Sequence, residues 1–252
     1  MERDRTLQAL AIHTERIHDD PVWARLRSLL DVMSRRSIRA TFFVYPFRAI
    51  VAGREEVALE RVNRLREEGH EIGQHTHFYA GEAIEKPNKV VDLSDDNVRC
   101  CLERDYRWLK RIAPPRGFTS GGWIVPEALY PALAERAFDY DCSSRSLVIK
   151  AGDAGYAAWL ERPEVRRFGE HSLWLLPTTH TLKQMLRLPR WAGLPGAPRR
   201  ARYRLVYFHD YDLLRWAVYV AAMQIVRFSG IRMTCGQVAA AIVDAKGGLN
   251  DC

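Results

Sequence analysis

The chain has 252 residues, of which 47% are hydrophobic and 27% are charged. This length and apolar content suffice for one large core and exclude a globally disordered chain. The formal net charge is +7, but no nucleic-acid-binding motif accompanies it, so we expect no nucleic-acid partner.

The cysteine content and the first residues both favour the cytoplasm. Five cysteines at irregular spacing fit neither a disulfide framework nor a zinc ribbon, which indicates a reducing compartment. Residues 1–5 are charged and no apolar stretch of signal-peptide length follows, so we predict no export signal.

Apolar strands alternate with amphipathic helices along the chain. We predict strands at 7–12, 40–44, 71–74, 173–176 and 205–208, and helices that begin near Asp19, Val57, Ser94 and Leu213. This alternation is typical of parallel βαβ units. The pattern does not separate a barrel from an open doubly wound sheet, but both place active sites at the carboxyl ends of their strands.

The late segments bear on membrane contact. The apolar stretch 213–226 is too short to cross a membrane and is predicted to be a buried helix. Basic residues concentrate at 183–204, and Gly193–Pro198 is the best candidate for an exposed loop. Two interpretations of 183–204 stand: a solvated loop, or a surface that touches an anionic membrane or a lipid-linked substrate at its periphery.

Histidines and carboxylates follow three of the predicted strands. They are His13 and Glu15 after the first strand, His75 and His77 after the third, and His209 and Asp210 after the last. Neutral imidazoles with a carboxylate are the ligands of a catalytic zinc-type site that keeps one position open for water. Residues two apart in an extended strand point to the same side, so His75 and His77 can face one ion.

Two motifs make a family resemblance specific. Ala40–Val44 reads ATFFV and Gly69–Thr76 reads GHEIGQHT, and both their order and their spacing resemble the polysaccharide-deacetylase (NodB-type) signature. Looser matches occur at 115–118, 140–144 and 206–209. The chain is therefore identified as a divergent member of that superfamily. The resemblance implies an α/β fold, a single distorted (β/α) barrel in one domain over residues 1–252.

The resemblance also implies roles for individual residues. His75 corresponds to the first ligand histidine, and Tyr79 stands where the family has its second, so His77 is proposed as the substitute. His209 corresponds to the catalytic acid, Asp210 is a candidate base, and Arg116 corresponds to an orienting arginine. The substrate-binding candidates are Phe118, Trp123 and Tyr79; Trp123 follows two glycines and is suited to stacking on a sugar ring.

The first motif departs from the family's adjacent aspartates, and two alignments compete. One follows the strand and makes His13 the base and Glu15 the metal ligand. The other keeps the distance to Ala40, matches 18–21 to the family pattern and makes Asp19 the ligand. We favour the first because its residues directly follow the apolar strand. In both, a histidine replaces the usual base aspartate.

These expectations define the function. The chain is expected to be a hydrolase of non-peptide C–N bonds that removes an N-acetyl group from an amino sugar or glycoconjugate. It would use a divalent metal, with zinc favoured and cobalt, nickel or manganese as alternatives. The competing hypotheses are another C–N hydrolase on the same fold, such as a deformylase, and a degenerate sugar-binding protein without activity.

Overall fold

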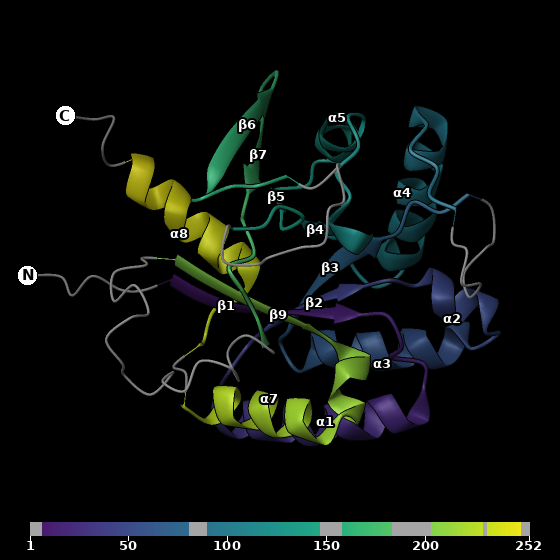
Figure 1. The fold of residues 1–252 in the computed structure, drawn as a ribbon, viewed down its shortest axis with the longest axis vertical. Helices are drawn as coiled ribbons and strands as arrows, with labels where there is room; N and C mark the ends of the chain where they lie inside the picture. The colour runs from purple at the N-terminus through teal and green to yellow at the C-terminus, as the bar shows by residue number, and fades with distance from the viewer. Residues whose placement is uncertain (1–6, 81–89, 147–157, 183–202, 229–230, 248–252) are drawn as a thin grey trace, which may run out of the picture.

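A computed structural model describes residues 7–80, 90–146, 158–182, 203–228 and 231–247. Within them one nine-stranded sheet has the order β6-β7-β5-β4-β3-β2-β1-β9-β8 (Figure 1). All neighbouring strands are parallel except β6 and β7. The strands are β1 (Leu7–Thr14), β2 (Thr41–Val44), β3 (Glu71–Thr76), β4 (Gly117–Ser120), β5 (Tyr140–Asp141), β6 (Glu164–Phe168), β7 (His171–Leu175), β8 (His180–Thr181) and β9 (Tyr203–His209).

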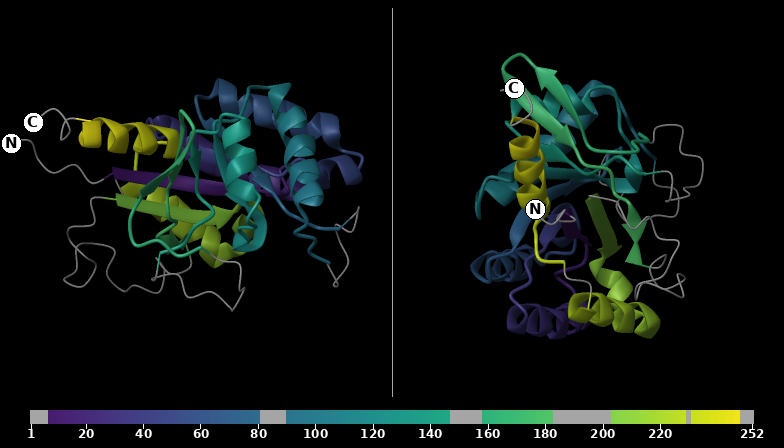
Figure 2. Two further views of the ribbon diagram at one scale, coloured as in Figure 1. Left: turned by 90° about the horizontal axis from the view of Figure 1, so that it is seen from above. Right: turned by 90° about the vertical axis from the view of Figure 1, so that its left-hand side faces the viewer.

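The sheet curls because one short segment joins its two sides. Residues 171–181 pair with β5 through β7 and with β9 through β8. Between these strands, Thr178 bridges to Arg145 just beyond β5. The result is the distorted (β/α) barrel that the sequence predicts, with its helices around the sheet (Figure 2).

Helices cover the outside of the sheet and one end of its interior. They are α1 (Asp20–Arg35), α2 (Phe47–Val51), α3 (Glu55–Glu67), α4 (Asp95–Lys110), α5 (Leu129–Glu135), α7 (Trp216–Phe228) and α8 (Cys235–Gly247), with short 3₁₀ turns η1 (Gly121–Trp123) and η2 (Asp210–Leu214). The helices α1 and α7 lie side by side (Figures 1 and 2). The first turn of α8 binds the amino ends of β2 and β3, through Thr41 and Glu71. None of the helices in the described ranges has both the length and the apolarity to span a bilayer.

The alternation of side chains along β1 decides what faces the interior. Leu10 and Ile12 belong to the apolar cluster under α1, α3 and α7. Ala9 and Ala11 belong instead to the interior cluster that α8 covers. Because side chains alternate along a strand, His13 continues the interior face. The strand therefore carries an apolar floor at its start and a polar group at its carboxyl end.

The five predicted strands are confirmed, within a few residues at their ends. The helix predicted from Asp19 begins at Asp20, with Pro21 in its first turn, and Ser94 caps α4 by accepting a hydrogen bond from the Asn97 N–H at 3.4 Å. The predicted helix at 213–226 is divided into η2 and α7. The proposed loop Gly193–Pro198 and most of the basic stretch 183–204 lie outside the described residues.

His70 is expected to make stability depend on pH. It is buried, and its Nδ1 accepts a hydrogen bond from the Ala40 N–H at 3.2 Å. Burial, aided by Arg39, lowers the pKa of His70 to about 4. In the unfolded chain this histidine has a pKa near the usual 6.5, so between pH 6.5 and 4 it is protonated in the unfolded chain but not in the folded one. This contribution is present above pH 6.5 and is lost as the pH falls toward 4, by up to about 3 kcal/mol.

The matched variant is His70→Asn, whose amide oxygen can accept the same hydrogen bond but does not titrate. Urea unfolding at several pH values between 7.5 and 5 is expected to give a shallower loss of stability for His70→Asn than for the unsubstituted chain. Parallel curves for the two proteins would show that His70 is not the titrating group.

Candidate functional site

Three side chains converge at the carboxyl end of the barrel interior. Glu15 directly follows β1, His75 lies near the end of β3, and His77 directly follows it. Both histidines share the parity of Gly73, which faces the ring of Phe43 in the interior cluster. Thr76, on the opposite parity, turns outward and donates a hydrogen bond to Asp105 of α4 at 2.9 Å.

The geometry of this cluster fits a bound metal ion. Oε1 of Glu15 lies 3.5 Å from Nε2 of His75 and 3.4 Å from Nε2 of His77. One ligand atom from each residue can be chosen so that all lie within 4.8 Å of one another. Both Nε2 atoms are buried and form no hydrogen bond within the described structure. Two ligands on one tetrahedral zinc ion, each about 2.1 Å from it, lie about 3.4 Å apart, close to these separations.

Outer contacts orient the two imidazoles. Nδ1 of His75 lies 2.9 Å from the carbonyl oxygen of Thr119, which can only accept, so this nitrogen carries the proton and Nε2 keeps its lone pair. Nδ1 of His77 lies 3.0 Å from the hydroxyl of Tyr79, whose ring stacks on the imidazole. A Cβ at Gly121 would clash with the His77 ring, so this glycine makes room for the imidazole.

The surroundings of the cluster keep the Glu15 carboxylate charged and the His77 imidazole neutral. Burial would raise the pKa of Glu15, but its contacts with His75 and His77 hold that pKa well below its ordinary value. Burial lowers the pKa of His77 to about 4. Arg48 of α2 lies 3.1 Å from Oε2 of Glu15 and so balances the charge on the oxygen that faces away from the histidines. These are the protonation states that metal ligands require.

His13 and His209 flank the cluster from adjacent strands. They are partners in the register of β1 and β9, and their ring centres are 5.3 Å apart. The His13 ring lies 4.7 Å from that of His75, and its Nε2 is buried without a hydrogen-bond partner. Burial, with the neighbouring His75 and His209, holds the pKa of His13 well below its ordinary value. His13 is therefore a neutral imidazole.

His209 is oriented by Asp212. Its Nε2 lies 3.6 Å from Oε1 of Glu15, whereas its Nδ1 lies 3.4 Å from Oδ2 of Asp212. The 3₁₀ turn η2 brings residues three apart onto one side, which places this carboxylate behind the imidazole. A carboxylate in that position stabilises a protonated imidazole and fixes its ring.

Asp210 does not have the environment of the base that the sequence suggested. Its two carboxylate oxygens accept hydrogen bonds from the main-chain N–H groups of Glu15, Arg16 and Tyr211, at 3.2, 2.8 and 2.8 Å. Burial raises its pKa to about 7 in spite of these contacts. The side chain holds the loop that carries Glu15, so we assign it a structural role.

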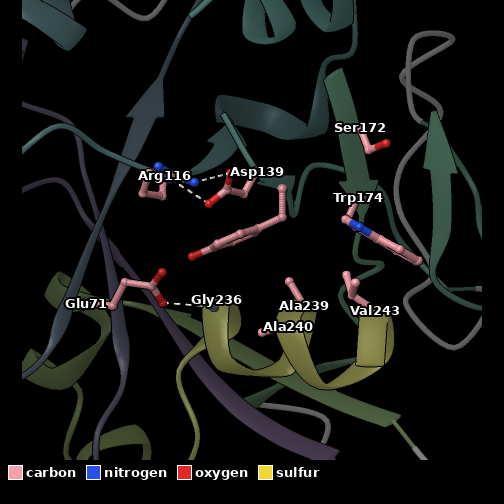
Figure 3. A pocket seen from close by; sticks show the side chains of 10 residues that line it. Glu71, Arg116, Asp139, Ser172, Trp174, Gly236, Ala239, Ala240 and Val243 are labelled. Atoms are coloured by element: carbon pink, nitrogen blue, oxygen red, sulfur yellow. Dashed lines mark hydrogen bonds and ion pairs between the residues drawn. The ribbon is translucent and has the colours of Figure 1, made fainter. Parts of the chain in front are cut away.

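Arg116 and Phe118 lie away from the cluster, contrary to expectation. Arg116 precedes β4, at the amino ends of the strands, where it forms a two-pronged ion pair with Asp139 (Figure 3). It lines a separate pocket there, together with Glu71 and Gly236. Phe118 is fully buried and packs on Phe138 in the core under α4 and α5. The motif at 115–118 located Arg116 along the chain but did not show at which end of the barrel it lies.

The remaining candidates, Asp19 and Trp123, differ in whether they lie near the cluster. Asp19 pairs with Arg16 and His18 rather than with the two histidines. Trp123 lies near the cluster: its ring is 5.8 Å from His13 and 4.8 Å from Tyr207. Its backbone has a φ of 63°, a conformation that non-glycine residues rarely adopt and that is concentrated at functional sites.

Sequence reasoning missed Arg48, Asp212 and Arg145. Arg48 follows the ATFFV strand by four residues, so a cation just beyond a strand end was the available signal. The spacing of three between His209 and Asp212 was a second signal, but it is informative only in a helical turn. Arg145 follows the segment 140–144, and nothing in its local pattern distinguishes it from a surface arginine.

The family comparison agrees with the motifs. The model of the polysaccharide deacetylase family matches residues 18–132, an interval that contains ATFFV and GHEIGQHT but begins after His13 and Glu15. No match to a curated protein sequence was found.

Solved structures share the fold at low sequence identity. A protein from Mycobacterium smegmatis assigned as a polysaccharide deacetylase is 18% identical, with a TM-score of 0.60 and coverage of 98% of this chain and 93% of that one. The CE4 domain of a xylanase from the hindgut metagenome of Trinervitermes trinervoides is 13% identical (TM-score 0.54, coverage 96% and 92%). A CE4-family pseudoenzyme from Bacillus anthracis is 11% identical (TM-score 0.53, coverage 93% and 66%).

Proposed function

We propose that this chain, a divergent member of the polysaccharide-deacetylase superfamily, is a metal-dependent hydrolase that removes an N-acetyl group from an amino sugar or glycoconjugate. One observation carries the proposal: two buried imidazole nitrogens, which have no hydrogen-bond partner among the described residues, face the same oxygen of a buried carboxylate. That arrangement is costly without an ion and ordinary with one.

Glu15, His75 and His77 would hold the metal. Two imidazoles and one carboxylate form the protein part of a catalytic zinc site, and cobalt, nickel or manganese accept the same ligands. When bound, such an ion polarises an acyl carbonyl and makes a neighbouring water more acidic. Arg48 would keep the second oxygen of Glu15 turned away, because the guanidinium already occupies it.

His13 and His209 would move the protons. The free Nε2 of His13 accepts a proton from the attacking water, and His209 donates one to the departing amine. Asp212 stabilises the charged form of His209 in the interval. General acid–base help of this kind typically contributes about 10²–10⁴-fold in rate.

The substrate would enter beside Trp123. Its ring is half-buried beside His13 and Tyr207, and the apolar face of a pyranose suits such a platform. Tyr79 touches His77 directly, so its role is to support that ligand rather than to bind sugar. We further propose a cytoplasmic location and a lipid-linked or nucleotide-linked sugar, with any contact to an anionic membrane peripheral.

Metal removal tests the proposed activity. Protein treated with a chelator is expected to lose the release of free amine from N-acetylated amino sugars, and added zinc, cobalt or nickel is expected to restore it. Parallel N-formyl substrates identify a deformylase, which would cleave them preferentially. Undiminished amine release after complete chelation would contradict the proposal.

A non-catalytic sugar-binding protein is the second candidate. His13 stands where the family resemblance places the base aspartate, and a CE4-family pseudoenzyme has the same fold. This alternative predicts glycan binding with no amine release in the presence of any of these metals.

A further inference from the structure

Arg145 is a buried cation that has no carboxylate partner among the described residues. It follows β5 and is only 4% exposed. Its main chain is held on two sides, by bridges to Trp159 and Thr178. Within the described structure its side chain forms no ion pair or hydrogen bond, and its Nε is buried without a partner. Buried arginines normally pair with an acid, because an unpaired buried charge is strongly destabilising.

Two indole rings lie within cation–π distance of the guanidinium. Its central carbon lies 5.4 Å from the ring centre of Trp123 and 4.9 Å from that of Trp159. A cation–π contact of this kind is made through the face of the guanidinium and offsets part of the cost of burying its charge. It leaves the N–H donors at the edge of the plane, whose forked geometry matches a carboxylate or phosphate.

Trp123 connects this arginine to the proposed catalytic cluster. The same indole that stacks on Arg145 lies 5.8 Å from the His13 ring. Arg145 and His13 thus contact the same indole, and His13 in turn flanks the cluster.

The charged residues around the site also favour an anionic substrate. Arg48 already balances Glu15, so a divalent ion there would leave a net positive site. Burial lowers the pKa of Arg145, and the group that opposes this effect is Tyr207 rather than a carboxylate. A positive site with a guanidinium at its edge that has no acidic partner in the described part of the chain attracts an anionic substrate.

We propose that Arg145 recognises an oxyanion, a carboxylate or a phosphate, carried by the sugar whose N-acyl group lies at the cluster. This deepens the proposed function, on which it rests: the substrate is an acidic amino sugar or glycoconjugate rather than a neutral glycan. Arg145 is then a specificity-determining residue, and Trp123 has two roles, as a platform for the sugar and as one wall of the arginine site.

The test compares matched sugars by calorimetry on the full chain. The probes are N-acetylglucosamine, its 6-phosphate and its 6-carboxylate (the uronic acid). Zinc-loaded and metal-free protein are compared, so that binding of the anion to the ion is separated from its binding to Arg145. The unsubstituted chain is expected to bind at least one acidic probe about tenfold or more tighter than the neutral one. The two acidic probes show which oxyanion is preferred.

Two substitutions assign the preference to Arg145. Arg145→Gln is expected to remove the preference for the acidic probe over the neutral one, and Arg145→Lys to retain part of that preference as a point charge. Equal binding of acidic and neutral probes to the unsubstituted chain, or a preference that persists in Arg145→Gln, overturns the proposal. If circular dichroism shows that Arg145→Gln unfolds at a lower temperature than the unsubstituted chain, the binding preferences of the unsubstituted chain and of Arg145→Lys provide the test.

These outcomes are separable from those that test the hydrolase. Arginine-dependent binding of an acidic sugar without amine release supports the recognition site and removes the hydrolase. Amine release with equal kcat/KM for acidic and neutral substrates supports the hydrolase and removes the recognition site.

Discussion

Replacing His75 with alanine is expected to abolish binding of a divalent ion and, with it, hydrolysis. The substitution removes one of the three proposed ligands. His75 is the most buried of them, and its ring is oriented by the Thr119 carbonyl. Loss of an outer contact typically costs 10–100-fold in metal affinity, so loss of the ligand itself should cost more than about 100-fold. Titration with zinc, followed by metal analysis of the dialysed protein, measures this directly.

Two control variants make this experiment decisive. Asp19→Asn tests the competing alignment of the first motif, because Asp19 pairs with Arg16 and His18. Arg116→Ala tests the arginine that pairs with Asp139 at the other end of the strands. Both variants are expected to retain metal affinity within about twofold, whereas Glu15→Gln should lose it as His75→Ala does. Stoichiometric zinc in His75→Ala, or its loss in Asp19→Asn, would refute the assignment of Glu15, His75 and His77.

The parallel sheet and the position of the cluster could be predicted because they depend on local periodicity, whereas the barrel was implied by the family resemblance. The alternation of strands and helices predicted parallel units, and the rule that sites lie at carboxyl strand ends predicted where polar groups meet. Parity within one strand then placed His75 and His77 on the same side. Glu15, two residues beyond His13, follows the same logic.

The failures share a different cause, which is contact between distant segments. β5 has only two residues, and β4 (GFTS) lacks the apolar run that marks β2 (TFFV), although both have four residues. Because β4 was not predicted as a strand, the sequence did not show that Arg116 lies at the amino end of β4. Asp210 and Asp212 are both acidic residues after one strand, and only the turn of η2 decides that Asp212 meets His209 whereas Asp210 meets the main chain of Glu15.

His13 decides whether the chain is an enzyme. His13→Asn is expected to lower the rate of amine release about 10²–10⁴-fold, because the amide cannot accept the proton of the attacking water. His13→Asp restores the carboxylate found at this position in the family resemblance and is expected to keep the activity close to that of the unsubstituted chain. Steady-state kinetics on metal-loaded protein provide the measurement, with zinc affinity as the control for an intact site.

The comparison of these two variants distinguishes a replaced base from a lost one. If the histidine is a working base, the unsubstituted chain and His13→Asp are active and His13→Asn is not. If the chain is a non-catalytic binder, the unsubstituted chain is as inactive as His13→Asn, and His13→Asp alone gains activity. The free Nε2 of His13, buried beside His75 with no hydrogen-bond partner in the described structure, favours the first result. A group retained only for packing would gain stability from an apolar side chain there, whereas a proton acceptor must keep that lone pair open.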